Sequence, residues 1–435
     1  MTLWSALLLP SADDTASSTD AALRALATWA LQFTPRVAVA DGAVLMEVEG
    51  SVRLFGGRRA LRDRVWGEGR ELGVSQLAWA PNSLAALALA RAGIENGFRQ
   101  PLPVLLDALP MECLSAVRPH RLTLAHIGCR TLGDVRRLPR GGMARRFDKH
   151  LLAALDQAYG LAPEVHQWVA LPEHFHERLE LMFRVDDAPA LLFGARRLLL
   201  VMSGWLAARH SGVTAFTLHW AHDAMRSKTA GEGGEITIRT AEPTRDIEHL
   251  CRLLAEHLAQ VKLLAPVGDL ALHAQEVHRL KERSASLLPD TVRQSETLHL
   301  VLERLAARLG PQRVLRPVLR EDHRQEWMCH WQPAPQPLPR KPAPAPDLPQ
   351  PTFVLPEPLK LAVRGNRPIY QGELQLLLGP QRVEGGWWDR DEVAGVTRNV
   401  VRDYWVALSK QAGVLWVFQT RLDESPAWFL HGHFA

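Results

Sequence analysis

Residues 37–48 read VAVADGAVLMEV, two apolar runs on either side of the dipeptide Asp41-Gly42. Asp-Gly is the strongest short signal for a two-residue turn between antiparallel strands, so this stretch predicts a β-hairpin. The flanking periodicities predict a strand at 2–10, a helix at 21–32, a helix at 58–72, a strand at 74–79 and a helix at 84–92 that is capped by Pro81-Asn82-Ser83. The resulting order β-α-β-β-α-β is that of a ferredoxin-like domain.

The length and composition of the chain indicate several soluble domains. At 435 residues, with 47% hydrophobic and 23% charged residues, three or four domains are expected. No apolar run reaches the roughly 20 residues of a membrane helix, and the apolar N-terminus carries no basic segment typical of a signal peptide. The four cysteines form no CxxC pair, which favours a reducing cytoplasm without disulfides or a zinc finger.

The rest of the chain divides by pattern. Residues 101–161 predict short helices separated by glycines, and residues 173–277 predict two strand-helix-strand halves followed by a helix at 297–309. Residues 331–358 are rich in proline and alanine, which predicts an extended linker. The remainder predicts a small β-rich domain with many aromatic residues. His174 and His176 have no further ligand nearby in the pattern, so a surface loop is favoured and no metal site is predicted.

A basic segment carries the nucleic-acid signal. The overall net charge is only +4, but residues 118–150 hold a large local excess of arginine. Within it, residues 124–135 read LAHIGCRTLGDV, two short helices joined by a glycine turn whose amides can face a phosphate. Thr131 is placed to cap the second helix. This looks like a helix-hairpin-helix, which grips DNA backbone without reading sequence. The predicted DNA-binding residues are Gly128, Arg130, Thr131, Gly133, Arg136, Arg137 and Arg140. A solvated basic face and an ordinary helix-turn-helix packing unit are the alternatives.

Several phrases resemble the Y-family lesion-bypass DNA polymerases. Residues 80–85, APNSLA, resemble the A-P-N-K-x-L-A segment of that family, with Ser83 in place of lysine, and residues 41–57 occupy the place of its S-x-D-E-x-x-L-D-V strand. The closest resemblance is to the catalytically silent ImuB-type branch of bacterial damage-induced mutagenesis cassettes. It runs through nearly the whole chain and includes the ending GGWW at 385–388, RDY at 402–404 and WFLHG at 428–432.

This resemblance implies an α+β fold with named parts. They are a ferredoxin-like palm remnant at 1–97, a helix-hairpin-helix thumb at 98–170, a little-finger-like α/β domain at 171–325, a Pro-rich linker at 326–359 and a C-terminal interaction domain at 360–435. It also implies an SOS-type, nucleoid-associated cytoplasmic role in translesion synthesis. The implied partners are primer-template DNA, an error-prone C-family replicative-type polymerase, a RecA-like adaptor of the same cassette and possibly the sliding clamp, with no membrane and no cofactor.

The residues needed for nucleotidyl transfer are missing from the pattern. Two divalent cations require several carboxylates, and residues 1–11 contain none. In the register set by Glu47, Gly42 and Ala43 stand where the family has its catalytic Asp and Glu. We therefore expect a degenerate site made of Asp41, Gly42, Ala43 and Glu47, with Asp41 in the turn and Glu47 solvated. Only residues 12–20 separate the first strand from the next helix, so the fingers module that covers the incoming nucleotide is also expected to be missing.

Two interaction elements complete the expectations. Residues 283–289 occupy the place of a clamp-binding peptide, but only Leu287 and Leu288 could anchor it, and a plain linker is an equal alternative. In the tail, exposed aromatics beside an arginine would form a partner-binding surface. The candidates are Trp387, Trp388, Arg402, Tyr404 and Trp405. The sequence thus predicts a non-catalytic scaffold. An active translesion polymerase with a remodelled site and a simple DNA-binding regulator remain the rival hypotheses.

Overall fold

The computed structural model describes residues 2–10, 16–223, 231–280, 298–320, 322–334, 350–391, 396–422 and 426–434. The chain forms two compact units, residues 1–308 and residues 309–435.

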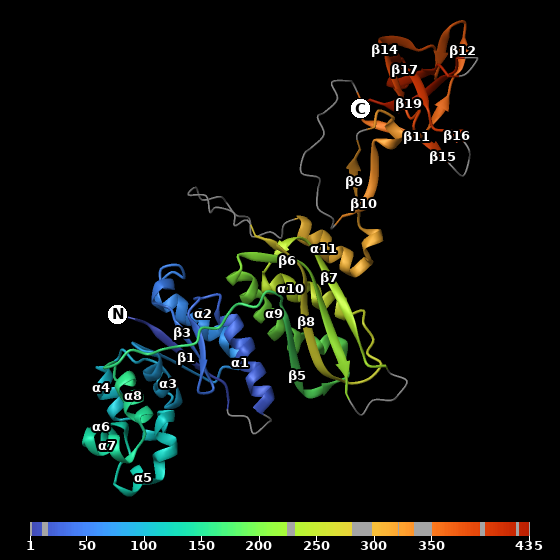
Figure 1. Cartoon of the computed structure of the whole chain (residues 1–435). Helices are drawn as coiled ribbons and strands as arrows, with labels where there is room; N and C mark the ends of the chain where they lie inside the picture. The colour runs from blue at the N-terminus through green and yellow to red at the C-terminus, as the bar shows by residue number, and fades with distance from the viewer. Residues whose placement is uncertain are drawn as a thin grey trace. The chain divides into compact units, whose positions relative to one another are not determined.

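The first unit opens with an antiparallel sheet of order β2-β3-β1-β4 (Figure 1). Asp41 and Gly42 form the turn of the β2–β3 hairpin with φ of 52° and 74°, as a two-residue turn requires. The elements follow the expected β-α-β-β-α-β order, with bounds β1 Trp4–Leu8, α1 Ala16–Ala30, β2 Val37–Ala40, β3 Ala43–Glu47, α2 Arg58–Glu71, β4 Gln76–Ala80 and α3 Ser83–Arg91.

Alternation along these strands separates two hydrophobic cores. Leu7, Val44 and Met46 pack in one core with α1 and α2. Ala6 and Leu45 pack in the other, with α3 and the helical region that follows. The helices of that region are α4 Leu102–Asp107, α5 Arg121–His126, α6 Leu132–Arg137, α7 Arg140–Arg146 and α8 Lys149–Ala158.

A second sheet, of order β5-β8-β6-β7, is built from the two expected halves β5-α9-β6 and β7-α10-β8. Leu270, Leu272, Phe216 and Leu218 on its strands are fully buried in the same core as the two helices. The bounds are β5 His176–Val185, α9 Leu191–Ala208, β6 Ser211–His222, β7 Gly233–Thr244, α10 Ile247–Leu258, β8 Val267–Arg279 and α11 Leu298–Leu309. Among the described residues, one apolar helix, Ala188–Ala208, is long enough to span a membrane, and most of it is buried in this core.

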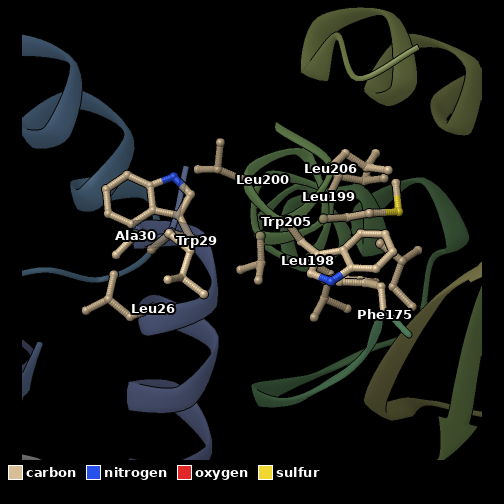
Figure 2. Packing of buried hydrophobic residues seen from close by; sticks show 14 of the residues in the cluster. Leu26, Trp29, Ala30, Phe175, Leu198, Leu199, Leu200, Trp205 and Leu206 are labelled. Atoms are coloured by element: carbon tan, nitrogen blue, oxygen red, sulfur yellow. The ribbon is translucent and has the colours of Figure 1, made fainter. Parts of the chain in front are cut away.

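Helices α1 and α9 join the two sheets of this unit into one core. Figure 2 shows Leu26, Trp29 and Ala30 of α1 facing Leu198 and Leu200 of α9. Gly204 makes this approach possible, because a Cβ there would lie 3.0 Å from Trp29. Arg196 of α9 adds an ion pair of 2.8 Å to Glu71 at the end of α2.

The second unit is an all-β fold. Its main sheet has the antiparallel order β11-β19-β18-β17-β14, and three two-stranded ribbons accompany it. The bounds are β9 Leu315–Leu319, β10 Cys329–Pro333, β11 Phe353–Lys360, β12 Ala362–Arg364, β13 Arg367–Ile369, β14 Gln375–Gly385, β15 Arg390–Asp391, β16 Val396–Thr397, β17 Val400–Ser409, β18 Gly413–Thr420 and β19 Trp428–His433.

The range expected to be linker, 326–359, includes folded structure at both ends. Strand β10 pairs with β9, and β11 pairs with β19 in the main sheet. The sequence pattern did not predict strand β11, because Pro356 and Pro358 interrupt its alternation of apolar and polar residues. The intervening residues 335–349 lie outside the described part of the chain.

Candidate functional site: an incomplete acid site and a helix-hairpin-helix

The acid site of a polymerase would be expected where β1 and β3 meet the hairpin turn. The structure pairs Leu8 with Ala43 at this point and leaves Asp41 on the exposed turn. The guanidinium of Arg91 donates to the backbone oxygen of Asp41 at 2.9 Å. Burial, followed by the nearby Arg118, lowers the pKa of Arg91, but arginine remains protonated. A fixed cation and an apolar pair therefore stand where divalent metals would need carboxylates.

Asp41 and Glu47 do not form a pair. Asp41 lies in the hairpin turn and Glu47 is the last residue of β3, and the strand from Ala43 to Glu47 alone spans about 13 Å at roughly 3.3 Å per residue. A two-metal site needs ligands that hold ions about 4 Å apart. Glu47 instead forms an ion pair of 2.6 Å with Arg36, and its side chain is only 11% exposed. The expectation that Glu47 is solvated was wrong, because cross-strand neighbours and Arg36 enclose it.

Metal ligation finds no other support in the described part of the chain. No group of three or more His, Cys, Asp or Glu residues there is arranged to hold an ion. His176 lies against His273 with their Nδ1 atoms 3.2 Å apart, while Phe175 beside it is buried in the core.

The N-terminus of α3 is already occupied by a carboxylate. Glu164, on the segment after α8, accepts from the backbone amides of Ser83 and Leu84, each at 2.9 Å. Asn82 caps the same helix by accepting from Ala85. A free helix N-terminus attracts phosphate, so Glu164 neutralises a position that would otherwise favour an anionic ligand. Local sequence patterns did not predict this role, because Glu164 lies 81 residues from Ser83.

The expected helix-hairpin-helix is formed by α5 and α6. Gly128 has φ of 90° in the connecting turn, and the Thr131 side chain caps α6 by accepting from Asp134, as predicted. The carboxylate of Asp134 accepts hydrogen bonds from the backbone amides of Thr131 and Arg130, each at 3.0 Å. The hydrogen bond from the Thr131 amide is the larger cause, followed by that from the Arg130 amide, of the lowered pKa of Asp134. Two amides that could have faced a phosphate are therefore occupied within the motif.

The arginines of the motif differ in availability. Arg136 lies 3.4 Å from Asp107 and stacks on Tyr159, with its guanidinium 4.4 Å from the ring centroid. Arg137 lies 3.6 Å from Asp134, and Arg140 makes a two-pronged ion pair with Asp156. Gly133 packs so closely on Asp107 that a Cβ would lie 2.8 Å from its carbonyl oxygen. Between residues 118 and 149, the arginine and lysine side chains that make no ion pair with a described residue are Arg118, Arg130, Arg145, Arg146 and Lys149.

These pairs do not remove the arginines from a DNA-binding surface. Exposed ion pairs contribute about 0–1 kcal/mol, whereas a guanidinium–phosphate contact can be two-pronged and charge-assisted. Arg130, Arg137 and Arg140 are exposed, and a phosphate can compete for each of them. The surface of α5 to α8 therefore keeps a basic character that DNA backbone can neutralise.

The tail residues fall into two groups. Trp387 and Trp388 are 74% and 58% exposed and lie edge to face, 5.2 Å apart. Tyr404, in contrast, is 2% exposed and donates or accepts a hydrogen bond of 2.7 Å with buried His431. Arg402 is held at 2.5 Å by Glu326, and Trp405 packs beside the core. Of the five candidate tail residues, Trp387 and Trp388 are the two exposed enough to contact a partner in this conformation.

The segment 386–389, which carries the two tryptophans, is called the tryptophan loop here. A buried arginine that the sequence pattern did not single out, Arg324, contacts it. Arg324 bonds Asp322 and Asp389, both at 2.8 Å, and its guanidinium lies 6.0 Å from the Trp388 ring. A Cβ on Gly386 would lie 2.5 Å from that guanidinium, so glycine is required there. The clamp candidates Leu287 and Leu288 lie outside the described residues.

No protein-family model matches the chain. Protein ImuB from two strains of Caulobacter vibrioides is 27% identical over 445 residues, covering 98% of this chain and 96% of each relative. Among solved structures, an insertion ternary complex of Dbh DNA polymerase is 13% identical, covers 60% of this chain and 76% of that one, and has a TM-score of 0.28. A DinB family error-prone DNA polymerase from Sulfolobus solfataricus is 11% identical over 64% and 99% of the two chains, also with a TM-score of 0.28.

The mixed α+β fold, with its ferredoxin-like strand order and helix-hairpin-helix, resembles the Y-family polymerase fold that the sequence resemblance implied. More specifically, the chain is a homologue of ImuB over its whole length, which confirms the resemblance seen in the sequence.

Proposed function

We propose that this protein is a non-catalytic accessory protein of translesion synthesis that holds primer-template DNA and recruits an error-prone polymerase. The observation that carries the proposal is the point where β1 ends and β3 begins, where Leu8 pairs with Ala43 and the Arg91 guanidinium donates to the backbone oxygen of Asp41. Nucleotidyl transfer needs two divalent cations held by several carboxylates. This edge of the sheet supplies neither the number nor the spacing of acids.

Two further features support the loss of nucleotide chemistry. Only residues 9–15 separate β1 from α1, which leaves no room for a module that closes over an incoming nucleotide. Glu164 fills the anion position at the N-terminus of α3, where the related polymerases carry a lysine in place of Ser83. An incoming triphosphate would therefore meet a carboxylate.

The DNA-holding part of the proposal rests on α5 to α8. Their exposed basic side chains suit sequence-independent contact with phosphates, and Arg130 makes no competing ion pair with a described residue. The partner-binding part rests on Trp387 and Trp388, large exposed aromatics held on a braced loop. As implied by the ImuB resemblance, the proposed partners are a C-family polymerase and a RecA-like adaptor, with the sliding clamp as a further candidate through Leu287 and Leu288.

Primer extension tests the proposal against an active polymerase that uses Asp41 and Glu47. Purified protein with primer-template DNA is expected to add no nucleotide in either Mg²⁺ or Mn²⁺, because the two carboxylates are too far apart to share ions. DNA binding measured in the same samples should be retained. Template-dependent extension that disappears in Asp41→Ala or Glu47→Ala would refute the non-catalytic role. Failure to bind any polymerase or adaptor would favour a simple DNA-binding regulator.

A further inference from the structure

A cavity of about 300 Å³ opens beside the N-terminus of α2. It is separate from the incomplete acid site, because Leu3 on its wall directly precedes β1 and Leu8 ends that strand, about 16 Å away along the chain. The lining residues are Arg58, Arg59 and Arg62 from α2, together with Leu3, Trp79, Glu95, Asn96 and Phe98.

Two of the elements that line this cavity, α2 and β4, carry hydrogen-bond donors that lack a side-chain acceptor among the described residues. Helix α2 begins after Gly57, which has φ of 108° and offers no side chain to cap the first-turn amides. Trp79 is 6% exposed, and its indole Nε1 is buried without a partner among the described residues. Burying an N–H group without an acceptor is costly, so this donor is an independent sign that something else completes the cavity.

Acceptors are few by comparison. Glu95 lies 3.7 Å from Arg62, and the Oδ1 atom of Asn96 already accepts from the backbone amide of Phe98. Arg58 and Arg62 pair with Glu49 and Asp63 at 3.2 and 2.8 Å. Both pairs are exposed and therefore weak, and each guanidinium has five N–H groups. Arg59 makes no ion pair with a described residue. The cavity thus has a surplus of donors that an oxygen-rich anion would satisfy.

We infer that this cavity binds a nucleoside 5′-phosphate, supplied by a free nucleotide or by the phosphorylated end of a DNA strand. Phosphate oxygens match the arginines and the open N-terminus of α2. The half-buried ring of Phe98, with the Arg58 guanidinium 5.9 Å from its centroid, offers a surface on which a base can stack. The volume lies at the lower end of the range for small-molecule sites, about 300–1,000 Å³, which suits one nucleotide. This inference does not depend on the proposed function.

Binding to the full chain tests the site with three probes. These are dAMP, inorganic phosphate, and a single-stranded oligonucleotide carrying either a 5′-phosphate or a 5′-hydroxyl. In the double variant Arg59→Gln/Arg62→Gln, the Kd for the nucleoside phosphate should rise at least about tenfold, since charge-assisted hydrogen bonds are lost. Trp79→Phe, which removes the N–H group and keeps an aromatic ring, should weaken binding by a smaller factor. Arg70→Gln, in the last turn of the same helix, is the matched control for charge and should leave binding unchanged.

The pattern of binding identifies the source of the ligand. Tight binding of dAMP assigns the cavity to free nucleotides, whereas a preference for the 5′-phosphorylated oligonucleotide without dAMP binding assigns it to DNA ends. The inference is overturned if no probe binds, if inorganic phosphate binds as tightly as dAMP, or if the double variant binds like the wild type. Because the two arginine positions are exposed, their replacement should not unfold the chain, which thermal unfolding checks.

Discussion

Single arginines in the helix-hairpin-helix show how a residue can serve both the fold and a ligand. Arg136 is tied to Asp107 and Tyr159, whereas Arg130 makes no ion pair with a described residue. Burial, followed by the hydrogen bond to Asp107, raises the pKa of Tyr159 and keeps the phenol as a donor. We therefore expect Arg130 to contribute more to DNA binding than Arg136, which must first leave its partners.

The triple variant Arg130→Ala/Arg136→Ala/Arg137→Ala should weaken DNA binding equally for all sequences and flatten its salt dependence. Each lost phosphate contact lowers the slope of log K against log salt by about one. Fluorescence anisotropy at several salt concentrations measures this slope, with Arg53→Ala, an exposed arginine outside the motif, as the control. An unchanged slope in the triple variant would place the DNA-binding surface elsewhere, on the sheet of β5 to β8.

His431 gives the second unit a stability that depends on pH. Burial, opposed by Glu326 and reinforced by Arg402, lowers the pKa of His431 to about 4 from an ordinary value near 6.5. Because the unfolded chain takes up the proton first, the stabilisation is fully present above pH 6.5 and is lost as the pH falls towards 4.

Unfolding of the full chain followed at pH 7, 6, 5 and 4.5 should show the stability of the second unit falling by an amount on the order of 3 kcal/mol. His431→Gln removes this titration and should flatten the dependence, whereas His433→Gln, at a partly exposed position, should not. Equal slopes in the wild type and His431→Gln would show that other groups cause the acid sensitivity.

At the scale of elements, the contact between α1 and α9 is the feature most open to a direct test. Gly204→Ala places a Cβ 3.0 Å from the backbone and ring of Trp29. We expect overpacking to lower the free energy of unfolding by about 1–3 kcal/mol. Gly142→Ala in α7 is the matched control, because a Cβ there meets nothing within 4 Å and alanine favours a helix. Denaturant unfolding would contradict the packing in Figure 2 if the two variants were equally stable.

The elements that could be predicted are those with local signals. The Asp41-Gly42 turn, the Asn82 cap and the Thr131 cap are each set by residues within a few positions, and the structure confirms all three. The contacts that could not be predicted join distant residues. Glu164 reaches Ser83 across 81 positions, and Arg324 reaches Asp389 across 65. A local sequence pattern carries no information on such pairs. The carboxylate of Glu164 at the N-terminus of α3 and the bond from Arg324 to Asp389 were therefore found only in the structure.

At the scale of the whole molecule, the boundary of the tail differs from the one that composition suggests. The second compact unit begins at Leu309, although the proline-rich stretch comes later in the chain. Arg324 and Glu326 lie before that stretch, yet they hold Asp389 and Arg402 within the C-terminal fold. Residues 309–334 are therefore part of the same folding unit as the tail.

We expect the segment 309–435, and not 360–435, to be the separable partner-docking module. A fragment 360–435 lacks the partners of Asp389 and Arg402, and breaking a buried ion pair by removing one partner costs about 3–5 kcal/mol. It also lacks Arg324, which lies beside the Trp388 ring and bonds Asp389, so binding through the two tryptophans should weaken. Fragment 309–435 should unfold cooperatively and retain the polymerase or adaptor in a pull-down, while 360–435 should do neither.

The complementary deletion separates docking from DNA binding. A chain ending at residue 308 keeps α5 to α8 and should bind primer-template DNA with an affinity close to that of the full chain, since those helices lie in the first unit. In cells, the same deletion should abolish damage-induced mutagenesis, because the polymerase partner is no longer recruited. The double variant Trp387→Ala/Trp388→Ala in the full chain sharpens the test, since both side chains are exposed and their removal should leave the fold intact. If the double variant still recruits its partner, the tryptophans are not the anchor. If the deletion also abolishes DNA binding, the second unit contributes to the DNA surface and the two functions are not separable.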